Sequence, residues 1–472
     1  MQSTMLSTSH LLLALSLAAS PALSQTARGI ARDDLARSLQ RLELALLSSP
    51  PAGEARAELE ASFDRATASF FMGSYGAALS GLDRMGAELD LAISGPPVLL
   101  PLELRTEPGP GPRQLSVEAV ALYGELPTLE ATLQLQDAAD EVLATRPVSL
   151  DEGSWVLEVR EGTKLDQDLW VSLQIDGRSG PRSQTSLAPE LPPRRVRRLL
   201  AELTGQNADP LSSMILRSRC ELLEDELSPM RSAEFLLAPH AFAGELEEEA
   251  RALAAGELPY AGRRGSWWLS LEDVPMRIVA PEGEGPWPLV LAFHGMGGDE
   301  NMFAEAYGAG HLAGLAKEHG FLLVCPSTYK VLRSQDELPR LLQLLGRLYP
   351  IDEERRYLVG HSMGAGLVAS LLGRSPSRWS GALSIAGVAP SSPANGERLP
   401  TCVQVHGELD GIIPAAPVQR AAGRLQAAGQ PLEFVLLENR GHTLVVPEAL
   451  DLGLARLGLL GPEETSPGTS PR

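Results

Sequence analysis

Residues 357–366 read Tyr-Leu-Val-Gly-His-Ser-Met-Gly-Ala-Gly, so that a short apolar run leads into the pattern Gly-x-Ser-x-Gly. A strand that enters a sharp turn and leaves as a helix presents the serine hydroxyl at the tip of that turn. Gly360 and Gly364 fit such a turn because a Cβ at either position would crowd it. The stretch therefore predicts a buried strand, a tight turn that carries Ser362 as a nucleophile, and a helix.

Other chemistry-bearing residues also follow predicted strands. The apolar run 289–293 opens into His-Gly-Met-Gly-Gly at 294–298, while Asp410 and His442 each follow a later strand. Because the carboxyl ends of parallel strands meet at one edge of a sheet, we expect these groups to lie close to Ser362. Their order along the chain is nucleophile, acid, histidine.

Each of these side chains suits one role in nucleophilic catalysis. A serine hydroxyl is a weak nucleophile at neutral pH and needs a base within hydrogen-bond reach, for which His442 is the candidate. A carboxylate fixes the tautomer of such a histidine and stabilises its protonated form. Asp410 is the candidate acid, with Glu408 and Glu438 as nearby alternatives.

The oxyanion that forms on attack needs two backbone donors. We expect the N–H groups of Met363, directly after the nucleophile, and of Met296, in the glycine-rich loop, to supply them. His294 is expected to brace that loop and His361 to pack beside the turn.

Strands and helices alternate over residues 265–461. We expect strands at 276–279, 289–293, 321–325, 357–359, 382–386, 403–405 and 432–436, and helices at 302–318, 338–348, 365–372 and 416–428. Such alternation is typical of an α/β domain, in which helices cover both faces of a doubly wound, mostly parallel sheet.

Residues 265–461 resemble an α/β-hydrolase. The stretch 349–364 is similar to the corresponding segment of polyhydroxybutyrate-depolymerase-like, feruloyl-esterase-like and prolyl-oligopeptidase-type enzymes, residues 406–414 to their acid loop, and 441–442 to their histidine loop. The resemblance implies a catalytic triad of Ser362, Asp410 and His442. No predicted β-propeller precedes the domain, which argues against a true oligopeptidase. No long insertion separates the serine from the acid, so we expect an open cleft without a large lid.

The chain of 472 residues is too long for one compact domain, and its patterning changes along its length. Residues 26–94 predict a helical segment. Residues 95–190, with short alternating runs between prolines and glycines, predict a β-sandwich-like accessory domain. Residues 191–264 predict a helical linker region before the catalytic domain at 265–461. Residues 462–472 are expected to form a disordered tail.

Residues 1–25 resemble an export signal. Leu11 to Ala19 form an apolar run of suitable length, and Ala22-Leu23-Ser24 offers small residues for cleavage, although Met1 to His10 contain no Lys or Arg. We expect an exported protein, periplasmic or extracellular. The run is too short to span a bilayer.

Composition excludes several classes of partner. A net charge of −20 argues against binding nucleic acid or an anionic membrane surface. No Cys/His cluster has zinc-ligand spacing, and the chemistry needs no cofactor. The three cysteines, Cys220, Cys325 and Cys402, cannot all pair, and we expect the last two to be buried and unpaired.

These observations predict an exported serine hydrolase that acts on small or polymeric carboxylic esters through an acyl-enzyme intermediate. One alternative is a serine peptidase of the prolyl-oligopeptidase type. A second is a binding or scaffold protein with an inactive hydrolase domain. Residues 327–340 and 387–399 are the expected walls of the substrate pocket, while the acyl group, the alcohol group and the oligomeric state are not specified by the sequence.

Overall fold

The computed structural model describes residues 30, 32–94, 102–122, 125–175, 178–187, 192–203, 209–223, 239–393 and 396–460. The predicted export signal and the predicted tail lie outside these residues.

An eight-stranded sheet dominates the C-terminal region, with the strand order β15-β14-β13-β12-β10-β11-β9-β8. Neighbouring strands from β11 to β15 run parallel, whereas β8 and β9 pair antiparallel at one edge. This arrangement confirms the predicted doubly wound, mostly parallel sheet. The strands are β8 (Gly265–Leu271), β9 (Val274–Ala280), β10 (Trp287–Phe293), β11 (Leu322–Pro326), β12 (Ile351–His361), β13 (Gly381–Ile385), β14 (Thr401–Gly407) and β15 (Leu432–Leu437).

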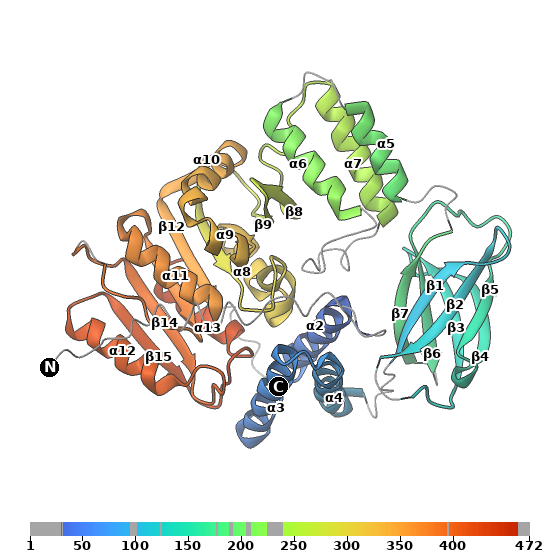
Figure 1. The fold of residues 1–472 in the computed structure, drawn as a ribbon, viewed down its shortest axis with the longest axis horizontal. Coiled ribbons are helices and arrows are strands. Elements are labelled where there is room, and N and C mark those ends of the chain that lie inside the picture. The colour runs from blue at the N-terminus through green and yellow to red at the C-terminus, as the bar shows by residue number, and fades with distance from the viewer. Residues whose placement is uncertain are drawn as a thin grey trace, which may run out of the picture.

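Helices cover both faces of this sheet (Figure 1). They are α8 (His311–His319), α9 (Thr328–Arg333), α10 (Leu338–Leu348), α11 (Met363–Arg374), α12 (Ala415–Ala427) and α13 (Val446–Arg456). Side chains alternate between two cores along β10: Leu289 and Leu291 belong to the core that includes side chains of α10, α11 and α12, whereas Val290 and Ala292 belong to the core that includes those of α8 and α13. Both faces of the strand are buried, as its continuous apolar sequence requires.

The predicted single helix at 302–318 is wrong. A π-helical turn (Met302–Ala306) and a 3-10 turn (Tyr307–Ala309) precede α8. Gly308 and Gly310 have φ angles of 57° and 84°, a left-handed conformation that interrupts an α-helix. The sequence analysis did not predict strand β8 or helix α13.

Residues 32–94 form three helices, α2 (Arg32–Ser48), α3 (Gly53–Phe71) and α4 (Tyr75–Ser94). Their apolar faces share one core, to which Leu42, Phe63 and Met85 contribute. Leu444, from the loop before α13, joins the same core. The helices therefore pack on the catalytic region at the edge where the predicted site residues lie.

Residues 102–185 form two antiparallel sheets around one core that includes Leu115, Leu133 and Leu173. The first sheet has the order β1-β2-β5 and the second β4-β3-β6-β7. The strands are β1 (Leu102–Pro108), β2 (Gln114–Ala121), β3 (Glu130–Asp137), β4 (Val142–Ser149), β5 (Ser154–Glu158), β6 (Leu169–Ile175) and β7 (Arg178–Thr185). We call this unit the sandwich.

The described residues between the sandwich and the large sheet include three helices, α5 (Pro192–Leu203), α6 (Pro210–Cys220) and α7 (Pro239–Ala254). Asp168 of the sandwich accepts hydrogen bonds from the backbone N–H groups of His240 and Ala241 at the start of α7. Buried Arg219 of α6 donates to the carbonyl of Trp268 in β8 and pairs with Glu249 of α7. The helices thus attach the sandwich to the antiparallel edge of the sheet.

All three cysteines are buried and free, as expected for Cys325 and Cys402. Within the described part of the chain, no helix combines the length and apolar character that a membrane crossing demands.

Candidate active site

Ser362 occupies the turn between β12 and α11, with φ 53° and ψ −112°. A positive φ is rare and strained for a residue other than glycine. The flanking glycines make this turn possible: a Cβ on Gly360 would lie 2.5 Å from the backbone of Gly364, and one on Gly364 would lie 1.9 Å from the carbonyl oxygen of Phe293. The sequence prediction of a tight strand–turn–helix unit is confirmed.

The structure brings Ser362, His442 and Asp410 together. The Oγ of Ser362 lies 2.9 Å from Nε2 of His442, and Nδ1 of His442 lies 2.8 Å from Oδ2 of Asp410. His442 and Asp410 are buried, whereas Ser362 is partly exposed. Because a carboxylate only accepts hydrogen bonds, it favours the tautomer with the proton on Nδ1, which leaves Nε2 free to accept from the serine hydroxyl.

Asp410 sits in a turn that supplies several donors to its carboxylate. The N–H groups of Ile412 and Ile413 donate to Oδ1 at 2.9 and 2.7 Å, and Nε2 of His406 lies 3.1 Å from Oδ2. Burial raises the pKa of Asp410, but the hydrogen bonds from His406 and His442 outweigh it and hold the pKa well below its usual range. The carboxyl is therefore ionised at neutral pH.

The two alternative acids lie elsewhere. Glu408 and Glu438 are exposed, and the carboxylate of Glu408 accepts a hydrogen bond from the N–H of Asn439. Neither carboxylate is the one that contacts His442.

The glycine-rich loop after β10 leaves one amide unused. The N–H groups of Gly295 and Gly297 donate to the hydroxyls of Tyr307 and Tyr329, and that of Gly298 donates to a carbonyl within the loop. In the described part of the chain, the N–H of Met296 has no such acceptor, and Met296 lines the pocket beside Ser362.

Met363 is the first residue of α11. At that position the amide has no intrahelical acceptor. The amides of Met296 and Met363 thus remain available for an incoming oxygen.

His294 and His361 brace the site as expected. The ring of His294 accepts from the N–H of Thr328 at 3.0 Å and contacts the carbonyl of Gly295. Nε2 of His361 lies 3.0 Å from the carbonyl oxygen of His442, which can only accept, so Nδ1 accepts from the hydroxyl of Tyr307 at 2.8 Å. Burial lowers the pKa of His361 to about 3, and the ring is therefore neutral.

Helix α3 contributes polar contacts that the sequence analysis missed. Asp64 accepts from the N–H of Gly411 at 3.0 Å and from that of His442 at 3.3 Å. Glu60 accepts from the N–H of Gly441 at 3.0 Å, and Arg56 pairs with Glu60. Their spacing of four residues places them on one helix face, but nothing in the sequence connects that face with residues 347 to 381 positions later.

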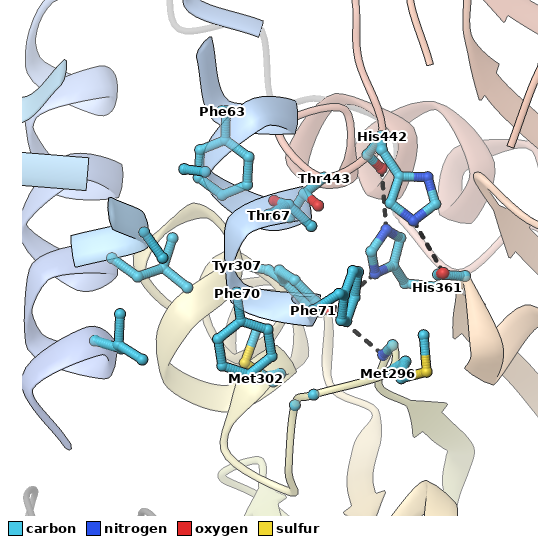
Figure 2. Close-up of a pocket in the computed structure, with 18 of the residues that line it drawn as sticks. Phe63, Thr67, Phe70, Phe71, Met296, Met302, Tyr307, His361, His442 and Thr443 are labelled. Carbon is cyan, nitrogen blue, oxygen red and sulfur yellow. Dashed lines mark hydrogen bonds between the residues drawn. The ribbon is translucent and has the colours of Figure 1, made fainter. Parts of the chain in front are cut away.

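A cavity of about 160 Å³ opens beside Ser362 and His442, and helices α2, α3 and α4 form its far wall (Figure 2). The space remains partly open, and the N-terminal helices supply a wall of it that the sequence analysis did not predict. Of the described residues in the expected wall segments 327–340 and 387–399, none lines this cavity.

Within the described residues, no group of three or more His, Cys, Asp or Glu side chains could hold a metal ion. The arrangement of serine, imidazole and carboxylate provides nucleophile and acid–base chemistry from protein groups.

Comparisons with known proteins place this site in a family context. Residues 331–452 match the model of the phospholipase/carboxylesterase family. No curated protein matches the chain. Among solved structures, esterase 2 of Thermogutta terrifontis is similar over 42% of this chain and 96% of its own, with 17% identity and a TM-score of 0.34. An S-formylglutathione hydrolase from Staphylococcus aureus is similar over 39% and 92%, with 12% identity and a TM-score of 0.33.

The mostly parallel sheet, the strand–turn–helix unit at Ser362 and the family-model match define a serine hydrolase with the α/β-hydrolase fold. The chain is a serine ester hydrolase, and its match to the phospholipase/carboxylesterase model covers residues 331–452. The narrower resemblance to depolymerase-like, feruloyl-esterase-like and oligopeptidase-type enzymes stays a prediction.

Proposed function

We propose that this enzyme cleaves carboxylic esters through a triad of Ser362, His442 and Asp410 and an acyl-enzyme intermediate. The observation that carries the proposal is the unbroken chain of contacts, 2.9 Å from serine to imidazole and 2.8 Å from imidazole to carboxylate. These distances lie within the range required for a nucleophile and its base.

In the first half of the reaction, Oγ of Ser362 attacks the carbonyl carbon while its proton passes to Nε2 of His442. The carbonyl oxygen gains the negative charge, which the N–H groups of Met296 and Met363 stabilise. The bond to the alcohol oxygen then breaks, the proton on His442 moves to that oxygen, and the acyl group stays on the serine. Asp410 stabilises the imidazolium throughout.

In the second half, a water molecule replaces the alcohol. His442 takes a proton from the water as its oxygen attacks the acyl carbon. The tetrahedral intermediate collapses, the bond to Ser362 breaks, and the proton returns to the serine oxygen. The products are a carboxylic acid and the regenerated enzyme.

We also propose that the protein is exported. The support is the apolar run from Leu11 to Ala19 followed by small residues at 22–24. N-terminal sequencing of the protein recovered from its native cells should find a mature chain that begins after this segment. A chain recovered from the cytoplasm that still begins at Met1 would contradict export and leave the chemistry untouched.

The nucleophile is tested by Ser362→Ala. This variant should lower p-nitrophenyl acetate hydrolysis by at least about 10³-fold with an unchanged circular dichroism spectrum. Ser370→Ala is the matched control, because Ser370 lies two turns further along α11 and contacts Gln335 instead of the cavity. Full activity in Ser362→Ala would overturn the assignment.

A further inference from the structure

The cavity beside Ser362 is mainly apolar on the side formed by the N-terminal helices. Leu35 and Leu39 of α2, Phe63 and Phe70 of α3, and Leu82 of α4 line it. Figure 2 shows Phe63 and Phe70 on one side of the cavity and His442 on the other. No Lys or Arg is among the described lining residues, so the cavity offers no cation to a charged substrate group.

The cavity adjoins the groups that we assign to the reaction. The loop 295–299 lines it, including Met296, whose amide we assign to the carbonyl oxygen of the substrate. No described residue of the acid loop 408–414 lines it. Ser362 and His442 line the cavity as well, so a group on either side of the bound carbonyl lies within reach of it. The acyl group matches it better, because this group stays bonded to Ser362 through both steps of the proposed reaction, whereas the alcohol leaves after the first.

We infer that this cavity binds the acyl group of the substrate, and that the enzyme selects esters of apolar acids such as medium-chain fatty acids. This inference rests on the proposed ester hydrolysis at Ser362. Burial of each added methylene favours binding by an amount that corresponds to about a fourfold change in an equilibrium constant. If part of that gain is realised in the transition state, kcat/KM rises with acyl length until the cavity is full.

Two ester series test the assignment. In the first, p-nitrophenyl esters from acetate to decanoate vary the acyl group; in the second, acetate esters from methyl to octyl vary the alcohol. We expect kcat/KM to rise by about two- to fourfold per methylene in the acyl series and to stay within about threefold across the alcohol series. A gain confined to the alcohol series, or a preference for acetate in the acyl series, would contradict the inference.

A variant that fills the cavity sharpens the test. Thr67 of α3 faces the cavity in Figure 2 and is not fully buried. Thr67→Trp should lower the ratio of kcat/KM for octanoate to that for acetate by about tenfold or more. Leu47→Ala, at a side chain of α2 that is 56% exposed and outside the cavity, should leave the ratio unchanged. An unchanged ratio in Thr67→Trp would overturn the acyl-site assignment. If the wild-type enzyme hydrolysed none of these esters, the proposed function itself would be overturned.

A second, independent observation concerns the polar face of α3. Asp64 holds two backbone N–H groups at once, Gly411 in the loop that carries Asp410 and His442 itself. One turn earlier, Glu60 holds the N–H of Gly441. The loops of the acid and of the base are thus tied to the same helix.

The carbonyl groups of the histidine loop are held as well. Arg56 of α3 donates to the carbonyl of Leu444 at 3.1 Å, and His361 donates to that of His442. The arginine also donates to Glu60 at 2.7 Å, which keeps this carboxylate in place. Donors and acceptors on both sides of His442 therefore fix its backbone, and its ring can meet both the serine and the acid.

We propose that Asp64 is a positioning residue, which aligns His442 with Asp410 by holding the backbones of both loops. It touches neither the substrate nor a reacting atom. Each of its carboxylate oxygens accepts one N–H, and an amide side chain offers only one oxygen. In Asp64→Asn the second N–H would face an NH₂ group, which leaves a donor unsatisfied and displaces one loop. Displacements of about 1 Å cost roughly 10²-fold in turnover.

Asp64→Asn is nearly isosteric and separates positioning from stability. We expect kcat for a short ester to fall by about 10- to 100-fold with KM within about twofold, and the rate of fluorophosphonate labelling to fall in parallel. Glu58→Gln removes the same charge from an exposed site on α3 and should leave kcat unchanged. A lower melting temperature with unchanged kcat would show a structural role only and overturn the proposal.

Glu60→Gln provides a second variant if Asp64→Asn is recovered only unfolded. The glutamine oxygen can still accept from Gly441, but its NH₂ group faces Arg56, so we expect a smaller fall in kcat of about three- to tenfold. Wild-type kcat in Glu60→Gln would then contradict the proposal. In either case Ser362→Ala remains the separate test of the ester hydrolysis itself.

Discussion

The N-terminal helices and the sandwich both precede the large sheet in the sequence, and they stand in different relations to the active site. Helices α2, α3 and α4 line the cavity beside Ser362 and bond to the loops of Asp410 and His442. The sandwich, in contrast, bonds to the start of α7 through Asp168 and contributes none of the described residues that line the cavity. Proximity in sequence does not explain this difference, because α2, α3 and α4 lie further from the large sheet along the chain than the sandwich does.

The difference is visible in the side chains of α3. Its apolar residues Phe63 and Phe70 face the cavity, while Glu60 and Asp64 face the catalytic loops. The strands of the sandwich, such as β3, alternate between one buried core and solvent. Helix α3 therefore contacts the catalytic loops as well as the core of its own three-helix unit. The strands of the sandwich bury their apolar side chains within the sandwich itself.

The largest expected effect is on kcat, and it follows the replacement of Asp410, which lies in a loop that is bonded to α3. Asp410→Asn should lower kcat by about 10³- to 10⁴-fold, because an amide can stabilise the wrong tautomer of His442 and cannot stabilise the imidazolium. Steady-state hydrolysis of p-nitrophenyl acetate measures this loss. Activity within tenfold of wild type would mean that another carboxylate supports the histidine.

The next prediction tests whether the sandwich can be destabilised without an effect on the active site. Leu133 is fully buried in its core, and Leu133→Ala should cost about 2–5 kcal/mol of its unfolding free energy. Differential scanning calorimetry should show the loss. Because the sandwich does not line the cavity, kcat and KM should stay at their wild-type values at 25 °C. A fall in kcat before unfolding would show that the sandwich is coupled to the site.

Buried Glu43 of α2 makes the N-terminal helices sensitive to pH. Burial raises its pKa to about 8, and one of its oxygens has no hydrogen-bond partner in the described part of the chain. The folded state keeps the proton that the unfolded state releases near pH 4.5, so stability falls as pH rises from about 4.5 to 8. Glu43→Gln does not titrate and should be more stable than wild type at pH 8.5, on the order of 3 kcal/mol.

Thermal unfolding of the wild type and of Glu43→Gln at pH 4 and pH 8.5 checks this prediction. At pH 4 both side chains are neutral, and the two melting temperatures should nearly coincide. A difference that is equal at both values of pH would contradict the linkage to Glu43.

The smallest effect concerns the contact between α3 and the glycine-rich loop. The ring of Phe70 lies so close to Gly297 that a Cβ there would approach it to 2.4 Å. Phe70→Ala should lower kcat/KM for p-nitrophenyl octanoate by about tenfold, since both the acyl wall and a support of the loop are lost. The same substitution at Met72, a 75% exposed side chain directly after α3 that does not line the cavity, should have less effect. Equal losses in the two variants would remove the special role of Phe70.

The sequence was informative where chemistry is local. Gly360, Ser362 and Gly364 specify a turn by their own steric requirements, and Asp410 and His442 follow strands whose apolar runs are plain. Seven of the eight strands of the sheet were therefore predicted, six of them to within two residues at each end, whereas β12 begins six residues earlier than predicted and β8 was missed. The broken helix at 302–318 was missed because the effect of Gly308 and Gly310 depends on φ angles that other residues impose.

The pocket could not be predicted for a different reason. Its apolar wall and the polar contacts of Asp64 arise from packing between residues that are hundreds of positions apart. The pattern of α3 shows apolar and charged residues at helical spacing, which is equally typical of a helix that packs on any neighbour. Only the three-dimensional arrangement reveals that this neighbour is the catalytic site.

The most direct test of the account is to trap the acyl-enzyme. Wild-type enzyme mixed with p-nitrophenyl octanoate and quenched within milliseconds should carry one octanoyl group, and mass spectrometry of its peptides should place that group on Ser362. An octanoyl group on another residue, or rapid turnover with no acyl group on the protein at any quench time, would contradict the central claim.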